Sequence, residues 1–285
     1  MPVVLADQSY GKSNVRLTRV LRHPDRHDLV EWSIDIEFKG DFADAYTAGD
    51  NQNVVATDTM KNRVYVLAKD FESSSPEEFA LRYAQDCLTD YSQVSSVSVS
   101  IAVESWQRIA VRGQAHPHAF VAGPAGRRIA AVRRTRDGVR VSSGIEDLPL
   151  LKTTNSAFRD FYRDALTTLP DADDRILGTW LTANWTYTPG QHDWDRLYEG
   201  VRRQLLEAFA VHVSLGVQQT AHAMGAAVLL ETPAVADISL VMPNRHRLLA
   251  NLTPFGRTND NEVFVTTSEP SGRITARLVR QDDQA

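Results

Sequence analysis

The stretch LVEWSIDIEFK, Leu29 to Lys39, alternates apolar and polar side chains without a break. A period of two is typical of a β-strand that turns one face to a core and the other to water. The apolar face would consist of Val30, Trp32, Ile34, Ile36 and Phe38. The turn-forming residues His23 to His27 would join this strand to a second one through Val15, Leu17 and Arg19. The sequence therefore predicts an antiparallel hairpin.

A helix is predicted at Ser75-Pro76-Glu77-Glu78, which combines a capping serine, a proline suited to the first turn and two acids at the positive end of the helix dipole. Its apolar face carries Phe79, Tyr83, Cys87 and Tyr91, so we expect Cys87 to be buried. The run from Val97 to Val103 then alternates like a strand. Arg136-Asp137-Gly138 has the residues of a hairpin turn between segments 129–134 and 139–142.

The same order recurs past Gly144. Leu177 to Tyr187 alternates like a strand, and a helix follows whose apolar stripe is Trp194, Leu197, Val201, Leu205 and Phe209. Strands are then expected at Ile238 to Met242, at Val263 and Val265, and at Ile274 to Leu278. The prediction is an α+β fold of two similar ββααββ halves, residues 1–143 and 144–285, each an antiparallel sheet with helices on one face. Exposed sheet edges favour assembly with further copies.

Composition narrows the class of protein. The 285 residues are 42% hydrophobic and 24% charged, as in globular proteins. A net charge of −5 argues against a nucleic-acid surface, and the one basic cluster, Arg127 to Arg136, is interleaved with apolar residues like a strand. Cys87 is the only cysteine, which excludes an intrachain disulfide and favours the cytoplasm. No apolar run approaches the ~18–20 residues that cross a membrane.

Six separated segments contain residue types suited to chemistry, and each has an ordinary structural explanation by itself. In GDNQNVVATDTMKN, Gly49 to Asn62, Thr57 and Asp58 could cap a helix. Lys12 in YGKSNVR could be a surface lysine, and His246 in VMPNRH a loop histidine. Phe158 in LKTTNSAF could pack in a core, while Arg175 in DDRIL and Gln218 in GVQQT could be surface residues.

Taken together and in this order, the six segments resemble urate oxidase (uricase) of the bacterial type, a tunnelling-fold family, from Tyr10 to about Arg280. The resemblance implies two tandem tunnelling-fold halves, whose chains pair edge to edge into a barrel and stack as a homotetramer. It also implies cofactor-independent oxidation of urate by O2 and water to 5-hydroxyisourate and hydrogen peroxide.

The resemblance assigns Lys12, Thr57 and His246 to a catalytic relay that removes a proton from the substrate. It assigns substrate binding to Thr57, Asp58, Phe158, Arg175, Val217, Gln218 and Asn244. In uricases the lysine, threonine and aspartate come from one subunit and the other binding groups from its neighbour. The active sites would therefore lie at subunit interfaces.

The shape of urate accounts for three of these residue types. A flat anion calls for an aromatic face over its rings, a guanidinium that grips one edge with two parallel hydrogen bonds, and an amide that binds the opposite edge. Phe158, Arg175 and Gln218 supply those groups at the matching positions.

Other functions are expected to fit less well. His116-Pro117-His118 lacks a third convergent ligand, so no metal site is predicted. A tunnelling-fold enzyme acting on a pterin or another purine is a second hypothesis, but such enzymes anchor the heterocycle with a carboxylate, where this chain has Gln218. A third hypothesis is a non-catalytic purine binder, in which replacing Lys12 or Thr57 would matter little.

Overall fold

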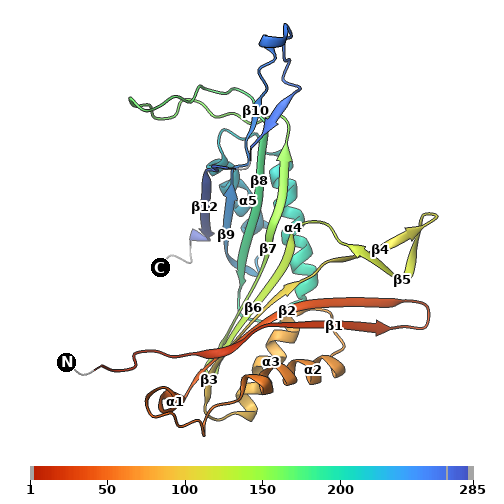
Figure 1. The fold of residues 1–285 in the computed structure, drawn as a ribbon, viewed down its shortest axis with the longest axis vertical. Coiled ribbons are helices and arrows are strands. Elements are labelled where there is room, and N and C mark those ends of the chain that lie inside the picture. Colours follow the sequence, from red (N-terminus) through yellow and green to blue (C-terminus); the bar gives the residue numbers. More distant parts are fainter. Residues whose placement is uncertain (1–2, 268, 282–285) are drawn as a thin grey trace. The chain divides into compact units, whose positions relative to one another are not determined.

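The computed structural model describes residues 3–267 and 269–281, which cluster into two compact units. The first unit takes the residues up to Gly144 together with Pro189–Asp195. The second takes Ile145–Thr188 and the residues from Arg196 on. Each unit combines an antiparallel sheet with α-helices, which confirms the predicted α+β class (Figure 1). Within the described residues, no helix has both the length and the apolar character needed to span a membrane.

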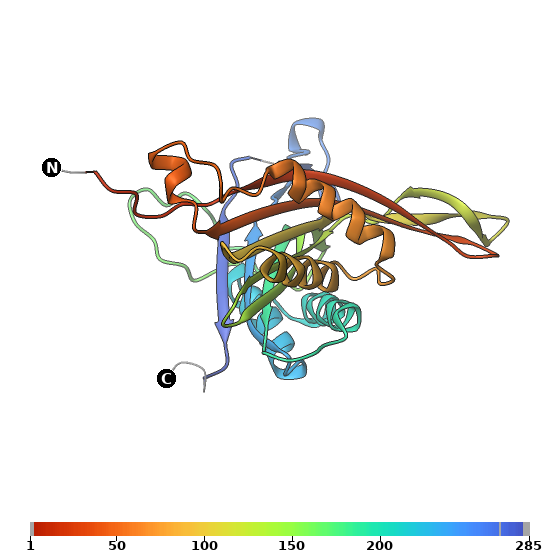
Figure 2. The same cartoon turned by 90° about the horizontal axis from the view of Figure 1, so that it is seen from below.

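The first unit is built on four neighbouring strands in the order β1-β2-β3-β6. Their bounds are β1 Tyr10–Arg22, β2 His27–Gly40, β3 Val94–Val103 and β6 Arg127–Thr135. The short helix α1 (Ala43–Thr47) is followed by α2 (Thr57–Asp70) and α3 (Pro76–Asp90). Figure 2 shows α2 and α3 side by side along one face of these strands, where α2 contacts β1 and α3 contacts β3 and β6.

The predicted alternation of β2 is confirmed. Its five apolar side chains, Val30, Trp32, Ile34, Ile36 and Phe38, are all buried with at most 7% exposure. Helix α3 begins as expected, because the Ser75 hydroxyl accepts a hydrogen bond from the backbone N–H of Glu78 and Pro76 occupies the first turn. Cys87 is fully buried, and this burial raises the pKa of its thiol to about 12.

The second unit repeats the arrangement with strand order β7-β8-β9-β12. Strand β7 (Val139–Lys152) contributes its residues from Ile145 on, and the others are β8 Leu177–Tyr187, β9 Val235–Pro243 and β12 Arg273–Val279. Helices α4 (Trp194–Val211) and α5 (Val217–Glu231) follow β8, and α5 packs on β9 and β12. The predicted stripe of α4 is largely confirmed, since Trp194, Val201, Leu205 and Phe209 are buried.

The structure departs from the predicted ββααββ order in two ways. A two-stranded hairpin interrupts each unit before its last strand: β4 (Trp106–Val111) with β5 (Gln114–Ala122), and β10 (Arg247–Leu249) with β11 (Phe264–Thr266). Val265 therefore pairs with β10 and not with the main sheet. Strand β7 also extends ten residues beyond the predicted 139–142 segment, to Lys152. Left-handed Asp147 (φ +52°) lies inside this strand, where period-two alternation is interrupted.

Candidate active site

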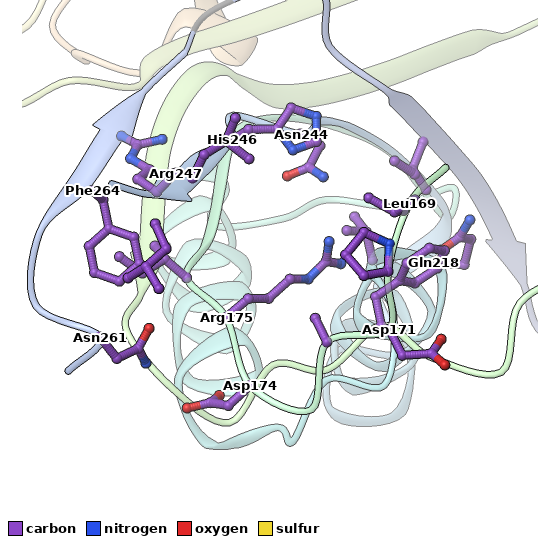
Figure 3. Close-up of a pocket in the computed structure, with 18 residues that line it drawn as sticks. Leu169, Asp171, Asp174, Arg175, Gln218, Asn244, His246, Arg247, Asn261 and Phe264 are labelled. Carbon is purple, nitrogen blue, oxygen red and sulfur yellow. The ribbon is translucent and has the colours of Figure 1, made fainter. Parts of the chain in front are cut away.

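A cavity of about 610 Å³ lies in the second unit, at the ends of several elements. Six residues expected from the sequence line it: Phe158, Arg175, Val217, Gln218, Asn244 and His246. They come from the loop between β7 and β8, the start of α5 and the segment after β9. Figure 3 shows Arg175 reaching toward the middle of the cavity, between Asn244 and Gln218. The fold thus brings together residues that are 86 positions apart, counted from Phe158 to Asn244 (244 − 158).

Arg175 is one of two arginines that line this cavity. Its Nε is buried and has no hydrogen-bond partner, and no ion pair joins it to a carboxylate in residues 3–267 and 269–281. Burial lowers the pKa of the Arg175 guanidinium. Because a desolvated cation without a counter-charge is unfavourable, an anion that entered the cavity would be stabilised there.

The neighbouring carboxylate is directed elsewhere. Asp174 accepts a hydrogen bond from the Thr154 hydroxyl at 2.7 Å and another from the Ser156 backbone N–H at 3.2 Å. These bonds, led by the one from Thr154, lower the pKa of Asp174 below its usual value. In Figure 3 the Asp174 carboxylate points away from the Arg175 guanidinium. Local hydrogen bonding therefore keeps Asp174 ionised without neutralising Arg175.

Phe158 is held at the wall of the cavity by backbone pairing. Its N–H donates to the Ala172 carbonyl at 2.8 Å, and the Ala172 N–H donates back at 2.9 Å. On the preceding residue, the Ala157 N–H donates to the Ser214 carbonyl at 2.7 Å. The Arg175 Cζ atom lies 5.1 Å from the centroid of the Phe158 ring. A guanidinium and an aromatic ring thus adjoin the same space.

The first turn of α5 provides the amide side of the cavity. Gly216 is the N-cap residue in an extended conformation, and no side chain caps the helix. Val217 is buried, whereas Gln218 is exposed. Backbone N–H groups in the first turn of a helix have no carbonyl partner within that helix. Together with the Gln218 amide they offer hydrogen-bond donors for a polar or anionic ligand.

The segment after β9 is fixed by backbone hydrogen bonds from both sides. The Asn244 N–H donates to the Gly272 carbonyl at 2.7 Å, and the Thr267 N–H donates to the His246 carbonyl at 3.1 Å. Arg247, which the sequence analysis did not select, also lines the cavity and passes close to Gly178. A Cβ atom at position 178 would lie 2.9 Å from the backbone carbonyl oxygen of Arg245, which cannot move aside as a side chain can, so this position favours glycine.

The first unit carries Lys12, and its backbone is irregular at that point. The register between β1 and β2 shifts between Lys12 and Val15, and Asn14 is left-handed with φ +56°. The Asn14 N–H donates to Asp35 Oδ1 at 2.6 Å, and Ser33 donates to Asn14 Oδ1 at 2.7 Å. A β-bulge therefore directly follows the half-buried Lys12.

Thr57 and Asp58 begin helix α2, but they do not cap it. The N-cap residue is Ala56 and no side-chain cap bond is formed, so interpreting either residue as the cap is wrong. The Thr57 side chain is half-buried and Asp58 is exposed. Hydrogen bonds from Lys61 and then Asn62 lower the pKa of Asp58, and the charge of Lys12 adds to this effect.

Several lining residues escaped sequence reasoning, among them Leu169, Ile176, Leu249, Asn261 and Phe264. Of these, only Ile176 lies inside one of the six segments that resemble the uricase family, DDRIL. Hairpin β10–β11 brings Leu249 and Phe264 to the cavity, and that pairing has no local sequence signal. Within the described part of the chain, no three His, Cys, Asp or Glu side chains form a group that could hold a metal ion.

Known proteins resemble this chain along nearly its whole length. The model of the family described as uricase matches residues 8–133 and 141–275. The uricase of Arthrobacter globiformis is 40% identical over 283 residues, which cover 99% of this chain and 92% of that protein. The uricase of Dictyostelium discoideum is 34% identical over 279 residues, covering 97% of each chain.

The fold agrees with these relationships. The crystal structure of the Arthrobacter globiformis uricase superposes with a TM-score of 0.95 at 39% identity, covering 100% of this chain and 98% of that one. Sequence and fold therefore agree over the segments that carry Lys12, Thr57, Arg175 and Gln218. The chain belongs to the uricase family.

Proposed function

We propose that this chain oxidises urate with O2 and water to 5-hydroxyisourate and hydrogen peroxide. The observation that supports this most directly is the Arg175 guanidinium, which is desolvated, has no carboxylate partner in residues 3–267 and 269–281, and lies beside the Phe158 ring. Such a group favours a flat anion over a neutral or cationic ligand. Membership of the uricase family supports urate as that anion.

The cavity groups suggest how urate binds. Arg175 would hold one edge of the anion with two parallel hydrogen bonds, and Gln218 would bind the opposite edge through its amide. Phe158 would stack on the rings, and the backbone N–H groups at Val217 and Asp58 would bind further oxygens. Asn244, with the Thr57 hydroxyl, would hold O2 or water above the ring. All of these groups act by position and charge.

The chemistry needs a base before it needs an oxidant. Lys12 would take a proton from bound urate through the Thr57 hydroxyl, with His246 exchanging protons with Lys12. The resulting dianion is a better electron donor and passes two electrons to O2, which leaves as hydrogen peroxide with two protons. Water then adds to the oxidised ring carbon as hydroxide and completes 5-hydroxyisourate. Urate itself is the reductant, so no redox cofactor is proposed.

We propose further that each site is shared between copies of the chain in a homotetramer. Lys12, Thr57 and Asp58 would come from one copy and the Arg175 cavity from its neighbour. The sheets of two tunnelling-fold halves, residues 1–143 and 144–285, would pair edge to edge with other copies into a barrel. The cytoplasm is the proposed location, supported by the single buried cysteine, Cys87.

The activity is tested by following the ultraviolet absorbance of urate together with oxygen uptake, in purified protein treated with a chelator. We expect urate to disappear with one O2 consumed per molecule and hydrogen peroxide to accumulate in the same amount. If neither signal changes, the proposed function fails. If chelation alone stops turnover, the function stands but the cofactor-free mechanism fails.

Sharing of the site is tested with two inactive variants. Lys12→Ala and Arg175→Gln are each expected to lose turnover, for want of the base or of the anion clamp. Co-expression should restore part of the activity, since mixed tetramers contain some sites with an intact Lys12 and an intact Arg175. Activity that never exceeds that of the separate variants, in tetramers shown to be mixed, would contradict the shared site.

A further inference from the structure

Phe158 stacks on another aromatic ring, that of Phe161, which has no role in the proposed binding of urate. The ring of Phe161 stacks on the ring of Phe158 with a centroid separation of 4.9 Å and an angle of 10° between the planes. Phe158 lines the cavity but Phe161 is absent from its wall. Phe161 therefore covers the face of the Phe158 ring that is turned away from the cavity, while the Arg175 guanidinium approaches the ring from the cavity, with Cζ 5.1 Å from its centroid.

The loop is shaped to bring these two rings together. Asp160 adopts the left-handed conformation with φ +58°, which aspartate tolerates better than most residues. Its N–H donates to Asp171 Oδ1 at 3.2 Å. Asp171 precedes Ala172, the residue that pairs with the Phe158 backbone in both directions. The turn at Asp160 is thus anchored to the same short bridge that holds Phe158.

Arg163 closes the stack on its outer side. Its Cζ atom lies 4.5 Å from the centroid of the Phe161 ring. Its Nη2 pairs with Asp171 Oδ1 at 2.8 Å, and its Nη1 donates to the Leu169 carbonyl at 3.2 Å. Four groups therefore succeed one another from the cavity outward: Arg175, Phe158, Phe161 and Arg163. A ring covered in this way cannot tilt without losing contact on its outer face.

We propose that Phe161 is a positioning residue, which fixes the plane of the Phe158 ring so that a flat heteroaromatic anion can stack on the cavity side of this ring, beside the Arg175 guanidinium. This inference rests on the proposed function for the identity of that anion. Phe161 touches neither substrate nor reacting atoms; it acts through Phe158. Arg163 in turn holds Phe161, but it is 46% exposed and contributes less.

Phe161→Leu tests the role because leucine keeps an apolar side chain and removes the planar stack. We expect about a five-fold rise in KM for urate and in the Kd of xanthine, a flat and unreactive purine, since stacked rings contribute beyond simple area burial. The value of kcat should change by less than about two-fold, because binding and not proton transfer is affected. Phe161→Tyr keeps the ring and should restore both constants.

Tyr162→Leu is the matched control, because Tyr162 is the next residue on the loop and is 89% exposed. It should leave KM, kcat and the xanthine Kd unchanged. Thermal unfolding of each variant shows whether it is folded. If Phe161→Leu does not fold, Arg163→Gln is used instead, and a rise of about two-fold in both binding constants is expected from the weaker support.

The positioning role of Phe161 is contradicted if Phe161→Leu has the wild-type xanthine Kd and urate KM, or if kcat alone falls. The xanthine titration also separates this inference from the proposed function. If the wild-type protein binds xanthine but does not oxidise urate, the proposed function fails, and the comparison of Kd values still decides the role of Phe161.

Discussion

Two desolvated arginines, one in each unit, are handled in opposite ways. In the first unit Arg128 bonds to Glu77 at 2.6 Å and to Asp195 at 2.7 Å, and Glu77 is completely buried. In the second unit Arg175 has no ion pair in the described ranges, and its nearest acidic neighbour in sequence, Asp174, bonds to Thr154. Both side chains have a buried Nε, yet among the described residues acids neutralise only Arg128.

The pKa values reflect this difference. Burial acts to lower the pKa of Arg128, but the charges of Glu77 and Asp195 outweigh it and raise the pKa. For Arg175 burial acts alone, and the pKa is lowered. A buried cation with its own carboxylates joins elements of a fold, here α3 to β6. A partly buried cation kept away from carboxylates is available to a ligand, at some cost in stability.

The largest effect is expected when Arg128 loses its buried partner. Glu77→Ala removes the buried carboxylate that pairs with the Arg128 guanidinium and also the acceptor for the Ser75 hydroxyl. We expect the free energy of unfolding to fall by about 3 kcal/mol, measured by urea denaturation. Glu78→Ala, at the exposed neighbouring position, should cost less than about 1 kcal/mol. Equal losses in the two variants would show that the buried ion pair contributes no more to the free energy of unfolding than an exposed glutamate does.

Removing Arg175 should have a large effect on activity and a small effect on stability. Arg175→Gln is expected to lower kcat/KM for urate about 100-fold, because a charge-assisted bidentate contact is lost. The free energy of unfolding should stay within about 1 kcal/mol of the wild-type value, since no native ion pair is broken. Arg159→Gln, on the same loop and 56% exposed, is the control for both measurements. A destabilisation as large as that of Glu77→Ala would remove the contrast between the two arginines.

A smaller effect on urate binding is expected when Asp174 loses its hydrogen bond from Thr154 and can turn toward Arg175. Thr154→Val removes the hydroxyl that donates to Asp174 at 2.7 Å. We expect about a five-fold rise in KM for urate, because a nearby carboxylate then competes for the guanidinium. Thr153→Val, one position earlier and exposed, should leave KM unchanged. An unchanged KM in both variants would mean that geometry alone keeps Asp174 away.

The smallest effect is the pH dependence of stability that comes from the buried thiol of Cys87. Burial raises the pKa of the Cys87 thiol from 9.0 to about 12. Because the folded pKa is the higher one, the contribution of the thiol is fully present below pH 9 and is lost as the pH rises toward 12. Between pH 8 and pH 10 wild-type protein should lose about 1 kcal/mol more stability than Cys87→Ala, by urea denaturation. Parallel pH profiles would indicate that the thiol titrates normally in the fold.

Local patterns were sufficient for the elements whose neighbours in space are also neighbours in sequence. Strand β2 and helix α3 show this, because alternation and capping depend on residues one to four positions apart. Hairpin β4–β5 was not predicted. It turns at Arg112 and Gly113, which both have positive φ, and arginine is an unusual residue for that conformation. Strand β7 contains left-handed Asp147, which interrupts the alternation used to find strands.

The site shows the same division. The residue types at positions 12, 57, 158, 175, 218 and 246 were found by resemblance, and their roles stay predictions. Nothing in the sequence near Arg175 indicates that its neighbour Asp174 bonds to Thr154, twenty residues earlier. The bulge after Lys12 includes a hydrogen bond from the Asn14 N–H to Asp35 in the adjacent strand. Between the stacked rings of Phe158 and Phe161 lies the left-handed residue Asp160, which no periodic pattern predicts.

The sequence by itself determined the α+β class, because periodicity and short motifs are properties of neighbouring positions. The division into two halves and the candidate site residues, which rest on the resemblance, stay predictions. Only the tertiary structure decided which charges are neutralised. Pairing depends on distance in space and on desolvation, and both arise when segments far apart in the chain pack together. Arg128 and Arg175 are alike as residues and differ only in what the fold has placed around them.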